Sequence, residues 1–455
     1  MPKIFVITTG LTGMLYASLE IACELEDAGF EVVYGCPQDV AETVERYGIG
    51  YRQLAPVTFD TEPVIPEFHG LLRSLRRIVH RAVHSGQRRR EAFRSMKIGT
   101  VLRALESVGP DVVLADIELH EYIISARIKG IPVIGLSPWF SLWRSSRLPP
   151  LWKPTIPGEN RWGSRPGIEL DWFRTTASHG ARNLANGLLS GFTDRASMLR
   201  SLSRTAKIPR RELIGSLKFP RPFIYRTLPV ITTAVEKLEF PHDRRADLYY
   251  AGPLGTHRRA ALEMVPKELE EFLIAGDGPG KKLIYCTVGS MENAGSTIVE
   301  HAIDAARLRP NWKFVVSAGD LVLNPDFGTL PKNVFVSKTI PQLKVLERAD
   351  CAIIHGGIHT INECLSAGVQ MLVISGGRFD QEGCAARVAY HRVGLRRDPL
   401  SADGTSIVSD LEKMFATEEY VERVRDVRDS SIAHRWPVAS ALGEILDSES
   451  EWVSA

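Results

Sequence analysis

The chain has 455 residues, of which 44% are hydrophobic and 24% charged, a composition typical of a globular protein with two or three domains of ~150 residues. The formal net charge of +2 argues against bulk nucleic-acid binding, and no apolar run of ~18 residues predicts a transmembrane helix. Six cysteines without C-x-x-C spacing, most of them in apolar runs, predict buried free thiols in a reducing, cytoplasmic compartment rather than disulfides or zinc.

The N-terminal half alternates strand-like and helix-like segments. Apolar runs predict strands over 3–9, 31–35, 111–115 and 131–136. Amphipathic segments that end at a glycine predict helices over 14–28, 40–47 and 122–129. This alternation predicts an α/β fold with a parallel, doubly wound sheet. Ligands of such sheets bind at the carboxyl ends of the strands, so the loops at 9–14, 116–120 and 137–140 are expected to converge.

Two residues at the end of the 111–115 strand can accept a proton. Asp116 follows the strand, and His120 lies four residues further on, at the start of the next helix. Both are candidate catalytic residues. The alternatives are a helix cap for Asp116 and an ordinary surface or helix-start histidine for His120.

An irregular stretch rich in tryptophan and phenylalanine follows, from 138 to 173. Such a loop can form the wall of a pocket for a flat or greasy acceptor, with Trp139, Phe140 and Trp143 as candidate lining residues. The alternative is that these aromatic residues only fix a long insertion to its domain.

The segment 73–97 carries nine arginine or lysine residues against one acid, Glu91. The favoured interpretation is a solvated basic helix. The alternative is a surface that attracts an anionic acceptor or makes peripheral contact with a membrane.

The second half repeats the alternation after a polar, proline-bearing region. The predicted organisation is a first domain over 1–238, a linker over 239–266, a second domain over 267–430, and a C-terminal segment 431–455 with a helix over 431–446. Apolar runs predict strands over 282–288, 311–316, 333–336, 351–354 and 371–374.

The most informative stretch runs from His355 to Gly383. A strand that ends in His-Gly-Gly and then opens a helix makes a phosphate site, because glycines allow close approach and the helix N-terminus offers free N–H groups. One turn further, Glu363 is placed to reach a ribose hydroxyl, and after the next strand Asp380 and Gln381 are suited to binding sugar hydroxyls. The order phosphate, ribose, hexose predicts a nucleotide-sugar site.

This segment resembles the donor-binding signature of the family 1 nucleotide-sugar-dependent glycosyltransferases, the plant and macrolide type. The matching residues are His355, Gly357, Thr360, Glu363, Asp380 and Gln381. Two positions depart from the pattern, since His359 replaces an asparagine and Thr339 replaces the tryptophan that precedes Pro341-Gln342. The resemblance implies the GT-B fold of two Rossmann-like domains, with His359, Gln342 and Ser290 as further donor contacts.

The resemblance also indicates a missing catalytic group. The family's general base, a histidine at the start of the first helix, corresponds to Met14, and the aspartate that orients that histidine corresponds to Asp116. A thioether does not take a proton near neutral pH, so Met14 contributes at most to an acceptor pocket.

We therefore expect an inverting glycosyltransferase that moves a hexose from a UDP- or dTDP-sugar to a small hydrophobic or ionisable acceptor of the natural-product type, without a metal or other cofactor. The resemblance further implies that the last helix crosses back to the first domain. Two alternatives stay open: a donor-binding auxiliary homologue without transferase activity, and a nucleotide-sugar epimerase of the same fold.

Overall fold

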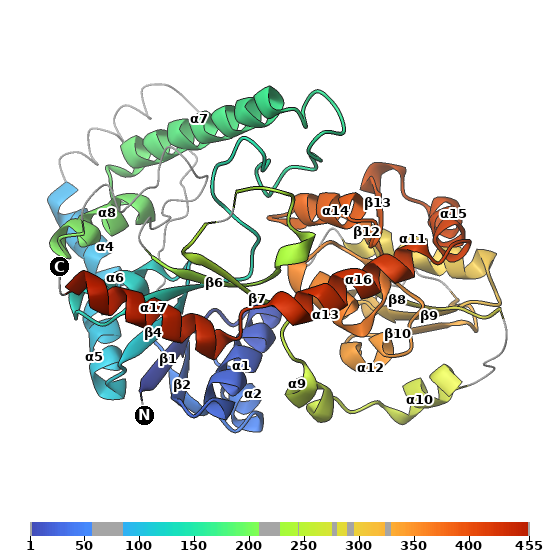
Figure 1. Cartoon of the computed structure of the whole chain (residues 1–455), viewed down its shortest axis with the longest axis horizontal. Helices are drawn as coiled ribbons and strands as arrows, with labels where there is room; N and C mark the ends of the chain where they lie inside the picture. The colour runs from blue at the N-terminus through green and yellow to red at the C-terminus, as the bar shows by residue number, and fades with distance from the viewer. Residues whose placement is uncertain are drawn as a thin grey trace.

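Each half of the chain forms its own parallel sheet, and the two sheets lie side by side along the long axis of the molecule (Figure 1). The computed structural model describes residues 2–56, 85–208, 228–243, 245–274, 280–288, 295–323 and 329–453.

The first sheet has seven strands in the order β3-β2-β1-β4-β5-β6-β7, and all neighbours pair in parallel. Most of its strands are buried on both faces, as parallel strands rich in valine and isoleucine are. The strands are β1 (Lys3–Ile7), β2 (Glu31–Cys36), β3 (Gly50–Gln53), β4 (Val112–Asp116), β5 (Val133–Ser137), β6 (Val230–Val235) and β7 (Leu248–Gly252).

The second sheet has six parallel strands in the order β10-β9-β8-β11-β12-β13. In both sheets the strand order reverses beside the first strand, which is the doubly wound arrangement, so the prediction of two Rossmann-like domains is confirmed. The strands are β8 (Leu283–Thr287), β9 (Lys313–Ser317), β10 (Val334–Ser337), β11 (Cys351–Ile354), β12 (Gln370–Ile374) and β13 (Gly394–Arg397).

Helices pack on both faces of each sheet. In β1, Ile4 and Val6 point into a core shared with α1 and α17, whereas Phe5 and Ile7 point into a core shared with α5, α6 and α8. In the first half the helices are α1 (Thr12–Asp27), α2 (Ala41–Arg46), α4 (Ser85–Ser95), α5 (Ile98–Val108), α6 (His120–Ile128), α7 (Arg165–Ser190) and α8 (Arg195–Thr205). In the linker and the second half they are α9 (His257–Leu262), α10 (Lys267–Ile274), α11 (Gly295–Leu308), α12 (Gln342–Leu346), α13 (Ile358–Ala367), α14 (Gln381–Tyr390), α15 (Gly404–Phe415), α16 (Glu419–His434) and α17 (Val438–Val453).

Two predicted boundaries were wrong. The first sheet extends to Gly252, because β7 lies inside the range 239–266 that was predicted as linker. The predicted helix over 431–446 is interrupted, since α16 ends at His434 and Arg435 is extended ahead of Pro437. The Trp436 N–H bonds the Tyr250 carbonyl at 2.9 Å, and α17 then packs on the first sheet, as the long helical band in Figure 1 shows.

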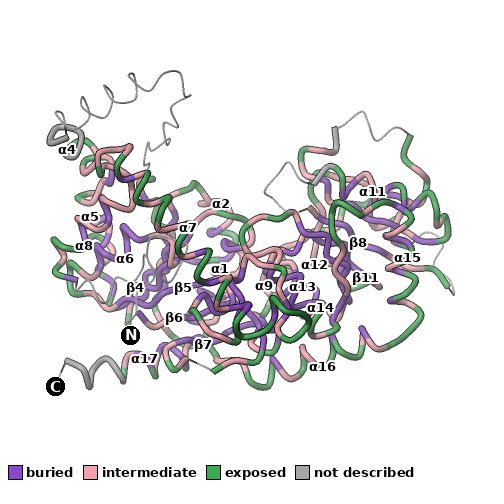
Figure 2. Tube along the Cα trace, turned by 90° about the horizontal axis from the view of Figure 1, so that it is seen from above, coloured by how far each residue is buried: buried purple, intermediate pink, exposed green. Residues whose placement is uncertain are grey.

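The two halves share one hydrophobic core. Phe140, Val235 and Tyr250 from the first half pack with Ile354, Ile361 and other residues from the second. Buried segments therefore run along both sheets and continue through the junction (Figure 2). Asn362 of α13 also donates a hydrogen bond of 2.9 Å to the Thr233 carbonyl, so α13 is fixed against the edge of the first domain.

All six cysteines are free and buried, which confirms the prediction. Among the residues that the structure describes, no helix is both long and apolar enough to cross a membrane.

Candidate functional site

The turn from β11 to α13 forms the centre of the candidate site. Gly356 has a φ of +91°, which glycine adopts without strain, and Gly357 caps α13 without a side-chain hydrogen bond. A Cβ on Gly357 would stand 2.5 Å from His355 Nε2, so this imidazole lies directly over the start of the helix. The N-terminus of α13, with Thr360 half-buried in its first turn, is therefore a place where backbone N–H groups meet a side-chain imidazole.

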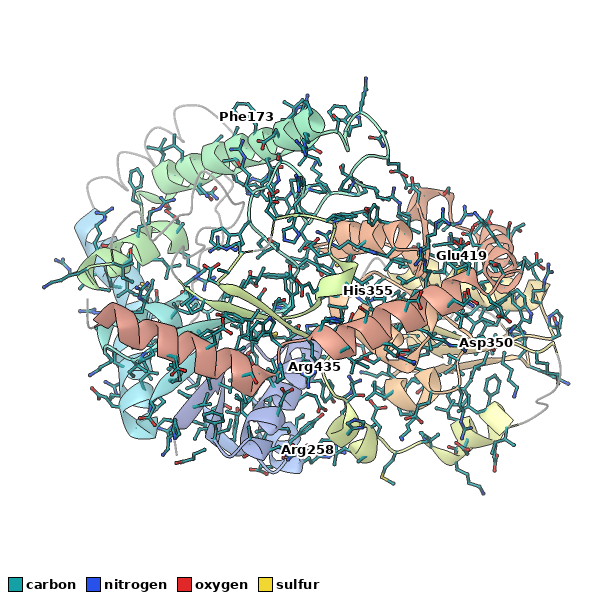
Figure 3. All side chains as sticks on the ribbon, in the orientation of Figure 1. Phe173, Arg258, Asp350, His355, Glu419 and Arg435 are labelled. Atoms are coloured by element: carbon teal, nitrogen blue, oxygen red, sulfur yellow. The ribbon has the colours of Figure 1, made fainter. Side chains whose placement is uncertain are left out.

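His355 lies in the middle of the molecule, between the two domains (Figure 3). Burial lowers the pKa of its imidazole to about 4, so the ring is neutral at pH 7. Its Nδ1 is buried and has no hydrogen-bond partner among the described residues.

The β12–α14 turn brings Asp380 and Gln381 next to this loop. A Cβ on Gly356 would stand 3.0 Å from the Gln381 carbonyl oxygen, which fixes how closely the two turns approach. Asp380 begins α14 and its carboxylate accepts from the Cys384 thiol at 3.3 Å, while the Gln381 side chain accepts from the Arg378 N–H at 3.3 Å. Phe379, just before them, has a φ of +48°, a strained value for a bulky residue.

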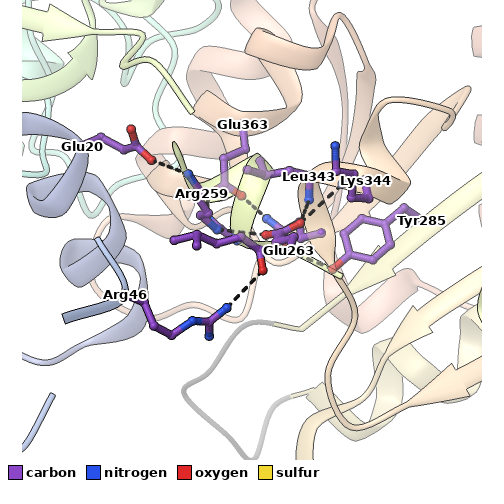
Figure 4. Close-up of polar contacts among 10 residues, drawn as sticks. Glu20, Arg46, Arg259, Glu263, Tyr285, Leu343, Lys344 and Glu363 are labelled. Carbon is purple, nitrogen blue, oxygen red and sulfur yellow. Dashed lines mark hydrogen bonds and ion pairs between the residues drawn. The ribbon is translucent and has the colours of Figure 1, made fainter. Parts of the chain in front are cut away.

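Glu363 lies one turn inside α13 and is part of a polar chain (Figure 4). Its carboxylate forms an ion pair with Arg259 and accepts a hydrogen bond from the Gln342 amide. The Tyr285 hydroxyl donates to Gln342 Oε1 at 2.9 Å. Glu363 and Gln342, both predicted as donor contacts, therefore lie side by side.

Arg259 was missed in the sequence. It belongs to α9, inside the predicted linker, and it also pairs with Glu263 at 3.0 Å. Glu263 in turn accepts the Leu343 N–H at 3.0 Å, at the start of α12. The only signal for this residue was the Arg-Glu pair at i,i+4, which is common on exposed helices and carries little information.

His359 faces the first domain. A Cβ on Gly13 of α1 would stand 2.7 Å from His359 Cδ2, so the ring fits only because residue 13 is a glycine. Burial, with a smaller contribution from Arg259, lowers the pKa of His359 to about 4. The histidine that departs from the family signature therefore forms part of the contact between the two domains.

Ser290, a predicted donor contact, lies outside the described residues.

Met14 does not line an open pocket, which corrects the prediction. It is 4% exposed and packs in the core formed by α1, β1 and α17, because the first turn of α1 directs this side chain inward.

Asp116, at the end of β4, is buried and accepts hydrogen bonds from the Thr9 hydroxyl at 3.3 Å and from the Glu118 N–H at 2.9 Å. It does not cap α6, whose N-cap is Leu119.

His120 is a poor candidate for a general base, contrary to one prediction. It is 4% exposed, and burial together with the nearby Arg195 lowers its pKa to about 3. Arg195 also holds Glu121 with two hydrogen bonds of 2.9 and 2.8 Å. His120 is thus a buried histidine at the start of α6, as one alternative predicted, and its low pKa makes it a weak base.

The aromatic stretch docks on the second domain. Phe140 is buried beneath the Arg387 guanidinium at 4.7 Å, and Arg245 covers the Trp143 ring at 3.6 Å, so neither presents that face to an acceptor. The backbone approaches α14 so closely that a Cβ on Gly383 would stand 1.8 Å from the Leu151 carbonyl oxygen. The prediction that Phe140 lines an acceptor pocket was wrong, because its ring packs against Arg387. The prediction was also wrong for the face of the Trp143 ring that Arg245 covers.

Trp139 is half-buried, and its carbonyl accepts the Thr232 hydroxyl at 2.6 Å. Its role in lining an acceptor pocket stays a prediction.

The basic run is only partly described. Residues 73–84 lie outside the described ranges, and α4 covers most of the rest. Arg90 and Arg94 are exposed on α4, as in a solvated basic helix.

Comparisons with known proteins point to one family. Residues 226–449 match the family model of UDP-glucoronosyl and UDP-glucosyl transferase. The chain is 29% identical over 173 residues to NDP-glycosyltransferase YjiC of Bacillus subtilis, a match that covers 37% of this chain and 43% of that relative. It is 22% identical over 410 residues to 4'-demethylrebeccamycin synthase of Lentzea aerocolonigenes, covering 86% of this chain and 87% of the relative.

The fold is that of a solved structure, the glycotransferase of kitacinnamycin. The TM-score is 0.67 at 20% identity, and the match covers 97% of this chain and 98% of the other. The GT-B arrangement of two Rossmann-like domains is thereby established for the whole length, whereas the matches to YjiC span less than half of that protein.

Proposed function

We propose, from the membership of this chain in the family 1 nucleotide-sugar-dependent glycosyltransferases, that it transfers a hexose from a nucleotide-diphosphate sugar to a small acceptor of the natural-product type. The observation that carries the proposal is the grouping of donor residues. His355, Gly357, Glu363, Gln342 and Gln381 come from three separate segments and gather around the N-terminal half of α13.

The chemistry follows from this grouping. The α13 N-terminus and the His355 imidazole would hold the diphosphate and stabilise its charge as it leaves, so the proposal calls for no metal. Glu363 would bind the ribose, and Asp380 with Gln381 the hexose. The acceptor would attack the anomeric carbon from the face opposite the diphosphate, which inverts the configuration.

Proton removal from the acceptor is assigned to Asp116 or to the acceptor itself. Asp116 stands at the carboxyl end of β4, where ligands of doubly wound sheets bind, and the Thr9 hydroxyl orients it. An acceptor that is already ionised, such as a carboxylate or an acidic phenol, needs little help from a base.

The second candidate is a donor-binding auxiliary protein without transferase activity, and the buried Met14 favours it.

The experiment that separates the candidate functions is to incubate the protein with uridine- and thymidine-diphosphate hexoses and a panel of acceptors, followed by mass spectrometry. Glycosylated acceptor with matching release of nucleoside diphosphate supports transfer. Donor that binds and stabilises the protein without turnover supports the auxiliary role, and an altered sugar without acceptor indicates an epimerase.

A further inference from the structure

Arg259 lies where the linker, the first domain and the donor side meet. Its backbone N–H donates to Glu20 at 3.1 Å, and its guanidinium carbon lies 4.3 Å from the centre of the Tyr16 ring, both on α1. The same guanidinium pairs with Glu363 on α13 and Glu263 on its own helix (Figure 4). The side chain is 13% exposed, so it has little freedom to take another orientation.

The pairing leaves Glu363 able to bind a ligand. A carboxylate has about four acceptor positions on its two oxygens. Arg259 uses one position on Oε1 and the Gln342 amide uses one on Oε2, and the Tyr285 hydroxyl fixes which way that amide points. One position remains on each oxygen, which matches the two adjacent hydroxyl donors of a ribose.

We propose that Arg259 is a positioning residue of the donor site, which holds the Glu363 carboxylate in the orientation that a ribose requires. This inference rests on the proposed function, because it assumes a nucleotide at α13. It also makes nucleotide binding depend on α1, since the first domain is what holds Arg259 in place.

The charges around Arg259 favour the same role. Burial raises the pKa of both Glu20 and Glu263, and the positive charge of Arg259 acts in the opposite direction, so the guanidinium favours the ionised carboxylates. Without Arg259, the Glu263 and Glu363 carboxylates would repel each other, and Glu363 would be free to turn away.

The test is a double-mutant cycle read by calorimetry. Uridine and thymidine diphosphate are titrated into wild type, Arg259→Gln, Glu363→Gln and the double variant, with inorganic pyrophosphate as a ligand that lacks the ribose. We expect Arg259→Gln to weaken binding of the nucleotide that the wild type binds by about tenfold or more. The double variant should bind no more than about threefold worse than Glu363→Gln. Pyrophosphate binding should change by less than about threefold.

The matched control is Arg258→Gln. Arg258 is the neighbouring residue on α9, but it pairs with Asp27 at 2.7 Å and Glu26 at 3.6 Å, both on α1. Its replacement should leave nucleotide affinity unchanged. Arg259→Lys, which keeps the charge but loses the planar fork, should give an intermediate affinity and serves in the cycle if Arg259→Gln does not fold.

Three results overturn the inference alone: nucleotide affinity unchanged in Arg259→Gln, equal losses for pyrophosphate and nucleotide, or independent and additive effects of the two substitutions. A wild-type protein that binds neither nucleotide overturns the proposed function and the inference together.

Discussion

His355 is the residue whose protonation a bound diphosphate would change most directly. The free imidazole is neutral at pH 7 because burial lowers its pKa to about 4. A diphosphate next to the ring favours the charged form, so binding would raise this pKa and take up a proton.

We therefore expect His355→Ala to weaken nucleoside diphosphate binding by ~1.5–3 kcal/mol. It should also remove the part of the pH dependence in which affinity rises as pH falls toward about 4, the pKa of the imidazole without ligand. The phosphate titrates in this range too, so the quantity to compare by calorimetry is the difference between wild type and variant at each pH. His434→Ala, at an exposed position on α16, is the control. Equal affinities for wild type and His355→Ala across pH would contradict the assignment.

Met14 occupies the position to which the resemblance assigned the family's histidine base, but its side chain points into the core. Met14→His would bury an imidazole, so we expect a loss of ~1–3 kcal/mol in unfolding free energy and no gain in turnover on plain alcohols. Denaturant unfolding and an acceptor assay check both parts. Met264→His, at a site 87% exposed, should be neutral. A rise in activity for Met14→His would show instead that only the base had been lost.

The candidate donor residues could be proposed from the sequence because they belong to short strand–turn–helix segments. His355 and Gly357 are neighbours along the chain, and the turn itself dictates their position. Arg259 could not be found in the sequence, because its contact with Glu363 joins residues 104 positions apart. That contact depends on how the linker passes from the first domain to the second. Phe140 was misjudged for a related reason, since nothing local reveals that Arg387 covers its ring.

At the scale of elements, the contact between the 148–152 loop and α14 ties the first domain to the β12–α14 turn. Trp172 supports the loop by donating to the Leu148 carbonyl at 2.7 Å. Glu239 and Arg387, both almost fully buried, add an ion pair between the same two parts of the molecule.

Gly383→Ala should disturb this contact. The new methyl group would meet the Leu151 carbonyl oxygen at 1.8 Å, where backbone and not a flexible side chain must move. We expect a loss of ~1–3 kcal/mol in unfolding free energy, together with reduced turnover, because Gln381 lies two residues away. Gly443→Ala on α17 is the matched control, since its methyl group would meet no atom within 4 Å and should stabilise the helix slightly. Equal melting temperatures for the two variants would refute the packing argument.

Several elements escaped prediction because their sequence signals were ambiguous. β7 lies in a polar, proline-bearing region that is typical of a linker, and only its pairing with β6 makes it a strand of the sheet. The break between α16 and α17 was missed even though Pro437 marks it, because apolar residues continue on both sides at helical spacing.

For the whole molecule, three histidines with lowered pKa values link folding to pH. The folded-state pKa is about 3 for His120 and about 4 for His355 and His359, against an ordinary value of 6.5. The unfolded chain therefore binds more protons below pH 6.5. Stability is fully present above that pH and is lost as pH falls toward 4.

The expected slope is ~1.4 kcal/mol of unfolding free energy per pH unit for each such histidine well below pH 6.5. Denaturant unfolding between pH 7 and pH 5 measures it. His120→Gln should lower this slope by ~1.4 kcal/mol per pH unit, the contribution of one histidine, whatever the substitution does to the absolute unfolding free energy. An identical slope in the variant would mean that His120 titrates normally in the folded protein.

The return of the chain end to the first sheet has a consequence for protein engineering. Residues 438–446 follow the whole second domain in sequence but are packed in space with β1 and α1, so the first structural unit is discontinuous. A chimera that exchanges donor domains between relatives would need two crossover points, one after β7 and one near Pro437. A single cut in the linker would pair the first sheet with a foreign final helix, so β1 and α1 would lose Val438, Leu442 and Ile445 as packing partners.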